Sequence, residues 1–231
     1  MIAVKQFFHN IKTSWKLVWP SNVFRAHLIL TILIFAAIVH FCALYMGIWE
    51  TRKGTLLLDP LLHMIPPKDF SIPIFCIIHS AVLISFILNW DNPKLLLKGF
   101  QAYGLLLVVR LICIYMIPLE TPRGMIYLND PFIGSMLNQV NVVTKDLFFS
   151  GHISSMCLFI YFSNKKIWRT YLIAVTPVLA GLILWQHVHY TVDIIAAPFF
   201  AFACSKLIDI VNEKWEFGVD KIEYPQLQYH P

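Results

Sequence analysis

The stretch AHLILTILIFAAIVHFCALYMGIW, residues 26–49, decides the fold, because it carries no Asp, Glu, Lys or Arg. A helix needs about 20 apolar residues to cross the hydrocarbon core of a bilayer, so this stretch predicts a membrane-spanning helix. Five further stretches of similar length are mainly apolar: residues 71–90, 97–118, 147–163, 170–187 and 190–210. The sequence therefore predicts an all-α, polytopic membrane protein in which six transmembrane helices form one bundle.

The composition of the whole chain agrees with this class. Hydrophobic residues make up 58% of the chain and charged residues 13%, against roughly 45–50% and about 25% in soluble domains. Residues 1–25, in which lysines alternate with Phe and Trp, predict an amphipathic helix lying on the bilayer, without the apolar core and cleavage site of a signal peptide. We expect residues 26–210 to form the catalytic membrane domain and residues 211–231 a cytoplasmic tail.

The loops differ in charge, and this difference predicts the orientation. With six spans, twelve Lys and Arg residues fall on the side of the two termini and five on the opposite side. By the positive-inside rule both termini are cytoplasmic. The net charge of +5 then reflects membrane orientation, and we expect no nucleic acid partner.

Most ionisable residues other than Lys and Arg that lie near span ends fall on the extracytoplasmic side. Ionisable groups at membrane depth are costly and are functional candidates by default. The residues are Glu120, Asp146, His152, His187, His189 and Asp193.

Two segments of this group suggest catalysis. In HVHYTVD, residues 187–193, His189 lies one turn before Asp193, so the carboxylate can hold one imidazole nitrogen and leave the other basic. In FFSGHISS, residues 148–155, Ser150 and Gly151 precede His152 and can cap a helix that presents backbone N–H groups to an anion.

Two imidazoles, a carboxylate and a helix N-terminus suit covalent phosphoryl transfer, in which one His attacks phosphorus and the other protonates the departing oxygen. Arg110 is the only Arg or Lys deep inside a span and could bind the phosphate, with Tyr115 one turn above it.

Several of these residues have a simpler interpretation. His27, His40 and His79 are interpreted as helix-packing residues and His63 as a loop residue. The pair His189 and Asp193 could lock two helices together, Arg110 could be paired structurally, and His187 could be an interface residue. A metal site is disfavoured, because His187 and His189 do not share a helical face and no HExxH or Cys pair accompanies them.

The residues also resemble a known family. DLFFSGHISSMCLFIYF (146–162) and HVHYTVDIIAA (187–197) resemble the third and fourth signature motifs of the sphingomyelin synthase family, a branch of the type 2 phosphatidic acid phosphatase superfamily. RLICIYMIPLETP (110–122) is similar to the second motif, and DPLLHMIPP (59–67) is only weakly similar to the first. The resemblance covers most of the chain from residue 50 to the last span.

The resemblance implies a reaction and a set of site residues. His189 would attack the phosphorus of a phospholipid donor, Asp193 would orient it, and His152 would act as acid and then as base. Diacylglycerol would leave, and a ceramide-type hydroxyl would accept the phospho-head group, phosphocholine or phosphoethanolamine for example, with no metal or other cofactor. Candidates for substrate or phosphate binding are Arg110, Tyr115, Glu120, Asp146, Ser150, Gly151, His187 and Tyr190.

The sequence departs from the motif pattern at three positions. Thr144 and Lys145 stand where Cys-Gly is usual before the motif Asp, and Glu120 stands where Pro is expected. We expect a compact, bacterial-type relative in an inner membrane. The sequence leaves open the donor head group and whether the chain forms a homo-oligomer.

Two further functions stay open. A lipid phosphatase or phospholipase C-like hydrolase would use the same phosphohistidine with water as acceptor. The phosphatases of the superfamily carry an Arg-Pro pair and an Arg six residues before the second His, whereas this chain has no Arg-Pro and has Ile183 at that position. A scaffold whose polar groups only pack helices is the non-enzymatic alternative.

Overall fold

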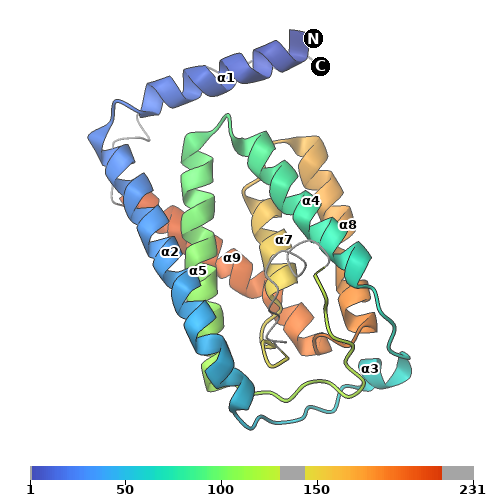
Figure 1. Cartoon of the computed structure of the whole chain (residues 1–231). Coiled ribbons are helices and arrows are strands. Elements are labelled where there is room, and N and C mark those ends of the chain that lie inside the picture. The colour runs from blue at the N-terminus through green and yellow to red at the C-terminus, as the bar shows by residue number, and fades with distance from the viewer. Residues whose placement is uncertain (1, 131–143, 215–231) are drawn as a thin grey trace.

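A computed structural model of the chain describes residues 2–130 and 144–214. Its helices, drawn in Figure 1, are α1 (Ile2–Val18), α2 (Asn22–Thr51), α3 (Pro60–Met64), α4 (Ser71–Asn89), α5 (Pro93–Met116), α7 (Gly151–Tyr161), α8 (Lys166–Trp185) and α9 (Thr191–Lys214). Residues 211–214 of the predicted tail belong to α9, and the rest of that tail lies outside the described residues.

Five helices of the described chain are long and apolar enough to cross a membrane, and they indicate an integral multi-pass membrane protein. They are α2, α4, α5, α8 and α9. The predicted count of six spans is not confirmed, because α7 has only 11 residues, about 16 Å of the ~30 Å hydrocarbon core.

The residues before α7 explain why it is short. The predicted span started at residue 147, but residues 147–150 are not helical. Leu147, Phe149 and Ser150 are nevertheless almost completely buried. Irregular backbone at membrane depth is tolerated where protein surrounds it, so α7 begins inside the bundle rather than at its surface.

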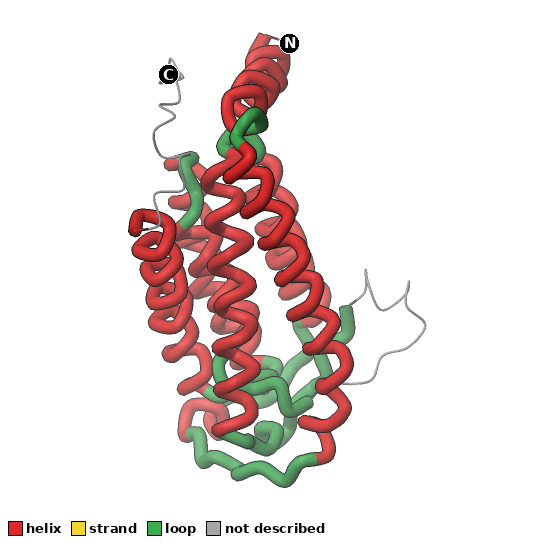
Figure 2. Tube along the Cα trace, turned by 90° about the vertical axis from the view of Figure 1, so that its left-hand side faces the viewer, coloured by secondary structure: helices red, strands yellow, loops and turns green. Residues whose placement is uncertain are grey.

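The helices run roughly along one direction, and most of the connecting loops gather at one end (Figure 2). We term this the site end, because α5 and α8 finish there and α4, α7 and α9 begin there. At the opposite end, Lys165 before α8 forms an ion pair of 2.7 Å with Asp91 between α4 and α5. This pair joins the loop that follows α7 to the loop that precedes α5.

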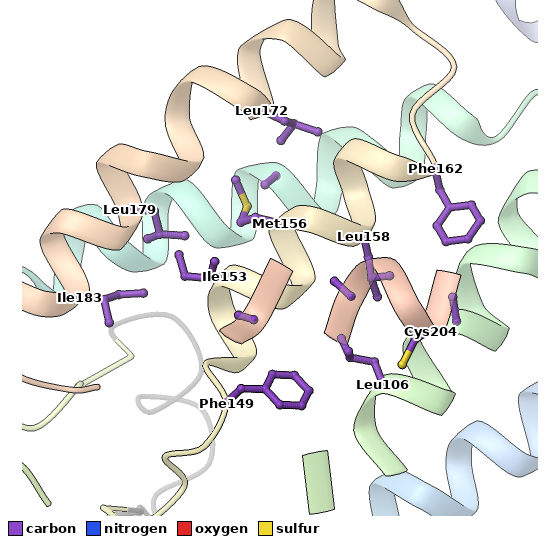
Figure 3. Packing of buried hydrophobic residues seen from close by; sticks show 14 of the residues in the cluster. Leu106, Phe149, Ile153, Met156, Leu158, Phe162, Leu172, Leu179, Ile183 and Cys204 are labelled. Carbon is purple, nitrogen blue, oxygen red and sulfur yellow. The ribbon is translucent and has the colours of Figure 1, made fainter. Parts of the chain in front are cut away.

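Helix α7 lies at the centre of the main core. It packs against α4, α5, α8 and α9, while α2 packs along α5 on the outside (Figure 1). Figure 3 shows Ile153, Met156 and Leu158 of α7 meeting Leu179 of α8 and Cys204 of α9. This apolar packing fixes the start of α7, and with it His152, against the other helices.

Helix α1 lies across the opposite end of the bundle (Figure 1). The indole N–H of Trp15 donates to the carbonyl of Trp90 at 3.0 Å, and its ring packs edge-on to Phe24. Val18, Phe24 and Leu97 form a small buried cluster beneath it. The helix is thus attached to the bundle; its position on a bilayer surface stays a prediction.

Candidate active site

The segment that leads into α9 and the first turn of that helix carry the predicted His and Asp pair in contact. His189 Nδ1 lies 3.3 Å from Asp193 Oδ2. The same carboxylate oxygen accepts a 3.0 Å hydrogen bond from the Tyr190 backbone N–H. Asp193 therefore acts like the acidic member of a capping box at the third helical position, which holds the carboxylate in place for the imidazole.

The first turn of α7 brings His152 beside this pair. The ring centroids of His152 and His189 are 6.3 Å apart and the rings are nearly perpendicular. The Ser150 N–H donates to the Asp193 carbonyl at 3.2 Å, which joins the start of α7 directly to α9. Two segments about forty residues apart in the chain thus contribute one imidazole each to the same place.

Arg110 of α5 holds the segment that leads into α7. Its guanidinium forms an ion pair of 2.8 Å with Asp146, and it also donates to the carbonyls of Asp146 at 3.2 Å and Phe149 at 2.8 Å. A Cβ atom on Gly151 would lie 2.9 Å from the Arg110 Cζ. Gly151 therefore permits the guanidinium to sit against the start of α7, and two of its five N–H groups stay available for a ligand.

Three buried polar atoms in this region have no hydrogen-bonding partner within the described residues. They are Ser150 Oγ, His152 Nδ1 and Asp193 Oδ1. Ser150 occupies the N-cap position of α7, as predicted, but its hydroxyl makes no capping hydrogen bond. Buried polar groups are nearly always paired, so three unpaired atoms on neighbouring residues indicate a site that binds a polar ligand.

His152 also faces a large cavity of about 530 Å³. Arg110, Asp146 and Gly151 line its end near the site, and mainly apolar side chains of α2, α4, α5 and α7 line the rest. His189 is not part of this lining, and only 2% of its side chain is exposed. A ligand in the cavity therefore meets His152 first and His189 behind it.

The side chains of His187 and Tyr190 connect the loops of the site end and make no hydrogen bond with His152 or His189. The two ring nitrogens of His187 lie 2.8 Å from the Arg123 carbonyl and 2.9 Å from the Ile65 carbonyl. Its backbone is left-handed, with φ 57°, an unusual conformation for a residue with a side chain. Burial raises the pKa of Tyr190, and its hydroxyl donates to the Glu120 carbonyl at 2.8 Å.

Glu120 stabilises the same loops. Its carboxylate accepts from the Gly54 N–H at 2.8 Å and pairs with Lys145 at 3.0 Å. These two hydrogen bonds hold the pKa of Glu120 below its usual value. Tyr115 lies apart from the other candidates, because 66% of its surface is exposed and its ring faces Arg52. Neither residue contacts His152 or His189.

Sequence reasoning missed two residues that position the start of α9. Asp59 caps α3 and also accepts hydrogen bonds from the Thr191 N–H at 2.7 Å and from the Thr191 hydroxyl at 3.0 Å. Burial opposes ionisation of Asp59, but these hydrogen bonds and those from Leu61 and Leu62 together lower its pKa. The Asp-Pro pair at 59–60 signals a helix start, but nothing local points to Thr191.

Gln186 is the second missed residue. It is fully buried, and its amide joins the start of α4 to the 117–130 loop through Phe70, Ser71, Ile126 and Tyr127. It immediately precedes the HVHYTVD motif, so it fixes where that motif begins.

One comparison with known proteins found a match over this part of the chain. Residues 145–209 match the family model described as PAP2 superfamily C-terminal. The match spans His152, His189 and Asp193, and it supports placement of the chain in the type 2 phosphatidic acid phosphatase superfamily, whose members are generally phosphatases or phosphotransferases. A search of curated proteins gave no match.

Proposed function

We propose that the protein is a lipid phosphotransferase that moves a phospho-head group from a glycerophospholipid to a ceramide-type alcohol. One observation carries the proposal: the His189 and Asp193 pair lies beside His152, which faces an apolar cavity of about 530 Å³. The charge count of the loops supports an orientation in which both termini are cytoplasmic and the site faces the extracytoplasmic leaflet.

In the first step the Nε2 atom of His189 attacks phosphorus while Asp193 holds its Nδ1–H. The bond between phosphorus and the diacylglycerol oxygen breaks, and His152 donates a proton to that oxygen. Diacylglycerol leaves, and the head group stays on His189 as a phosphohistidine. Arg110 is close enough to the start of α7 to bind the phosphate oxygens with its remaining N–H groups.

In the second step His152 acts as the base. It removes the proton of an acceptor hydroxyl, whose oxygen attacks phosphorus, and the bond between phosphorus and His189 breaks. An apolar cavity next to His152 favours a lipid alcohol over water as the acceptor. Ile183, which replaces the Arg of the superfamily phosphatases, is fully buried in the apolar core, and this also favours transfer.

The test supplies purified protein with a fluorescent ceramide and, in turn, phosphatidylcholine, phosphatidylethanolamine or phosphatidylinositol. A new polar sphingolipid together with diacylglycerol supports transfer. Free phospho-head group or phosphate with no lipid product would support hydrolysis instead. No product with any donor would refute both reactions and leave the scaffold interpretation.

Matched histidine variants separate catalysis from folding. We expect His152→Ala to lower the rate by about 10²–10⁴-fold, the usual contribution of general acid–base catalysis, and His189→Ala to remove turnover. His63→Ala is the control, because His63 is exposed on α3 at the same end of the bundle. Equal losses in all three variants would contradict the assignment.

A further inference from the structure

The cavity that begins at His152 continues far beyond the reacting groups. Its lining on α5 runs from Arg110 to Leu95, and on α7 from Gly151 past the helix end to Phe162. At 1.5 Å per residue these distances are about 22 Å and 16 Å. Both exceed ~15 Å, which is half of the hydrocarbon core, so a cavity of this length that runs along the spans would extend past the middle of the bilayer.

Two polar residues line the far end of the cavity among apolar ones. The lining there includes Ser85 and Asn89 of α4, and the buried Asn89 Oδ1 has no hydrogen-bonding partner within the described residues. The Ser85 hydroxyl accepts a hydrogen bond from the Trp168 indole at 2.9 Å. The mainly apolar lining thus extends from His152 to Ser85 and Asn89.

The dimensions of the cavity suit one hydrocarbon chain. Successive bonds of an extended chain advance by about 1.2 Å, so 16–22 Å corresponds to about 13–18 carbons. A methylene occupies roughly the volume of a water molecule in the liquid, about 30 Å³, so a cavity of about 530 Å³ holds about 17 of them. The volume therefore agrees with one long chain.

We propose that this cavity binds one acyl or alkyl chain of the lipid that reacts at His152, and that the cavity selects this chain by its length. The inference rests on the proposed function. Gly99 of α5 is the position at which this selection can be changed. It lines the cavity, and a Cβ atom placed on it meets nothing within 4 Å. It lies eleven residues from Arg110, or about 16 Å along the helix.

A larger side chain at position 99 would shorten the cavity. We expect Gly99→Phe to leave room for a chain of about 13 carbons and to exclude the end of an 18-carbon chain. Each excluded methylene lowers affinity by about fourfold, so the preference for 18 over 12 carbons should fall by at least tenfold. Gly181→Phe is the matched control, because Gly181 is exposed on α8, outside the cavity lining, and its Cβ position is equally open.

The experiment measures binding without requiring turnover. The full-length protein in detergent is mixed with diacylglycerols that carry two 12-carbon or two 18-carbon chains, and thermal stabilisation is titrated for the wild type, Gly99→Phe, Gly99→Leu and Gly181→Phe. We expect the wild type and Gly181→Phe to bind the 18-carbon lipid more tightly, and both Gly99 variants to lose that preference. Unchanged melting temperatures without lipid show that the variants fold.

Two results would overturn the inference. An unchanged preference in both Gly99 variants would mean that the chain leaves sideways, between Phe86 and Phe100, which line the cavity and are partly exposed at the surface. An equal change in Gly181→Phe would mean that the effect does not arise in the cavity. Length-dependent binding without transfer would refute only the proposed reaction, and transfer without length dependence would refute only this inference.

Discussion

The ion pair between Arg110 and Asp146 allows two roles of Arg110 to be separated by a double-mutant cycle. Arg110→Met removes three hydrogen bonds and leaves the Asp146 carboxylate without its partner. Removing one partner of a buried pair costs about 3–5 kcal/mol. Because the Asp146 side chain is 32% exposed, water compensates part of this loss, and we expect a cost of about 2–3 kcal/mol.

Asp146→Asn should cost less, about 1–2 kcal/mol, because it removes a charge and keeps an oxygen that can accept from Arg110. Each single variant loses the Arg110–Asp146 interaction, and the double variant loses the same interaction only once. We therefore expect the double variant to be more stable than the sum of the two single changes predicts, by about 1–2 kcal/mol.

Thermal unfolding in detergent measures this coupling, at about 2–4 °C per kcal/mol for a chain of this size. The rate of head-group transfer to ceramide measures the second role of Arg110, which is phosphate binding. If Arg110 also binds phosphate, Asp146→Asn keeps substantial activity, whereas Arg110→Met and the double variant lose it. A coupling below about 0.5 kcal/mol would show that the two side chains act independently, and an active double variant would remove the phosphate-binding role.

Other contacts at the site end give three further predictions. Gly54→Ala should destabilise the protein by about 2–3 kcal/mol, measured as a lower melting temperature, because its Cβ would lie 2.4 Å from the Leu119 carbonyl carbon; a stable variant would contradict the packing of these loops. Asp193→Asn should lower the transfer rate by about 10⁴-fold, as loss of the orienting carboxylate does in catalytic triads, with little change in melting temperature; a loss below tenfold would show that Asp193 does not orient His189. Hydrogen bonds lower the pKa of Asp59 in the folded protein. The Asp59 carboxylate therefore stabilises the fold above its unfolded pKa near 4, and this stabilisation is lost as the pH falls below that value. Melting temperatures measured between pH 6 and pH 3 should fall less steeply for Asp59→Asn than for the wild type.

The sequence predicted the helical membrane fold because each long apolar stretch is a local signal. The largest difference is at the predicted span 147–163, where α7 begins only at Gly151. Residues 147–150 are as apolar as a span, but Arg110 binds the carbonyls of Asp146 and Phe149 and so holds this segment in a non-helical conformation. Apolarity alone cannot distinguish such a segment from a helix, since both are buried.

In the site, too, local contacts could be predicted from the sequence and long-range contacts could not. The contact between His189 and Asp193 was predictable, because residues four apart at the start of a helix are neighbours. The contacts of Asp59 with Thr191, and of Gln186 with the 117–130 loop, join segments far apart in the chain and leave no local pattern. Tyr115 shows the converse: the spacing placed it one turn above Arg110, but not on the side that faces the site.

The three residues that depart from the motif pattern form contacts in the loops of the site end. Lys145 and Glu120, two positions at which the sequence departs from the resembled family, form an ion pair of 3.0 Å with each other. Thr144, at the third, binds Glu50 at the end of α2. All of these contacts lie in the loops of the site end, while the reacting groups keep the spacing of the motifs. These departures therefore change loops beside the site and leave the motif residues themselves unchanged. Under the proposed function, we expect differences from the resembled family in the choice of head group before differences in the chemistry.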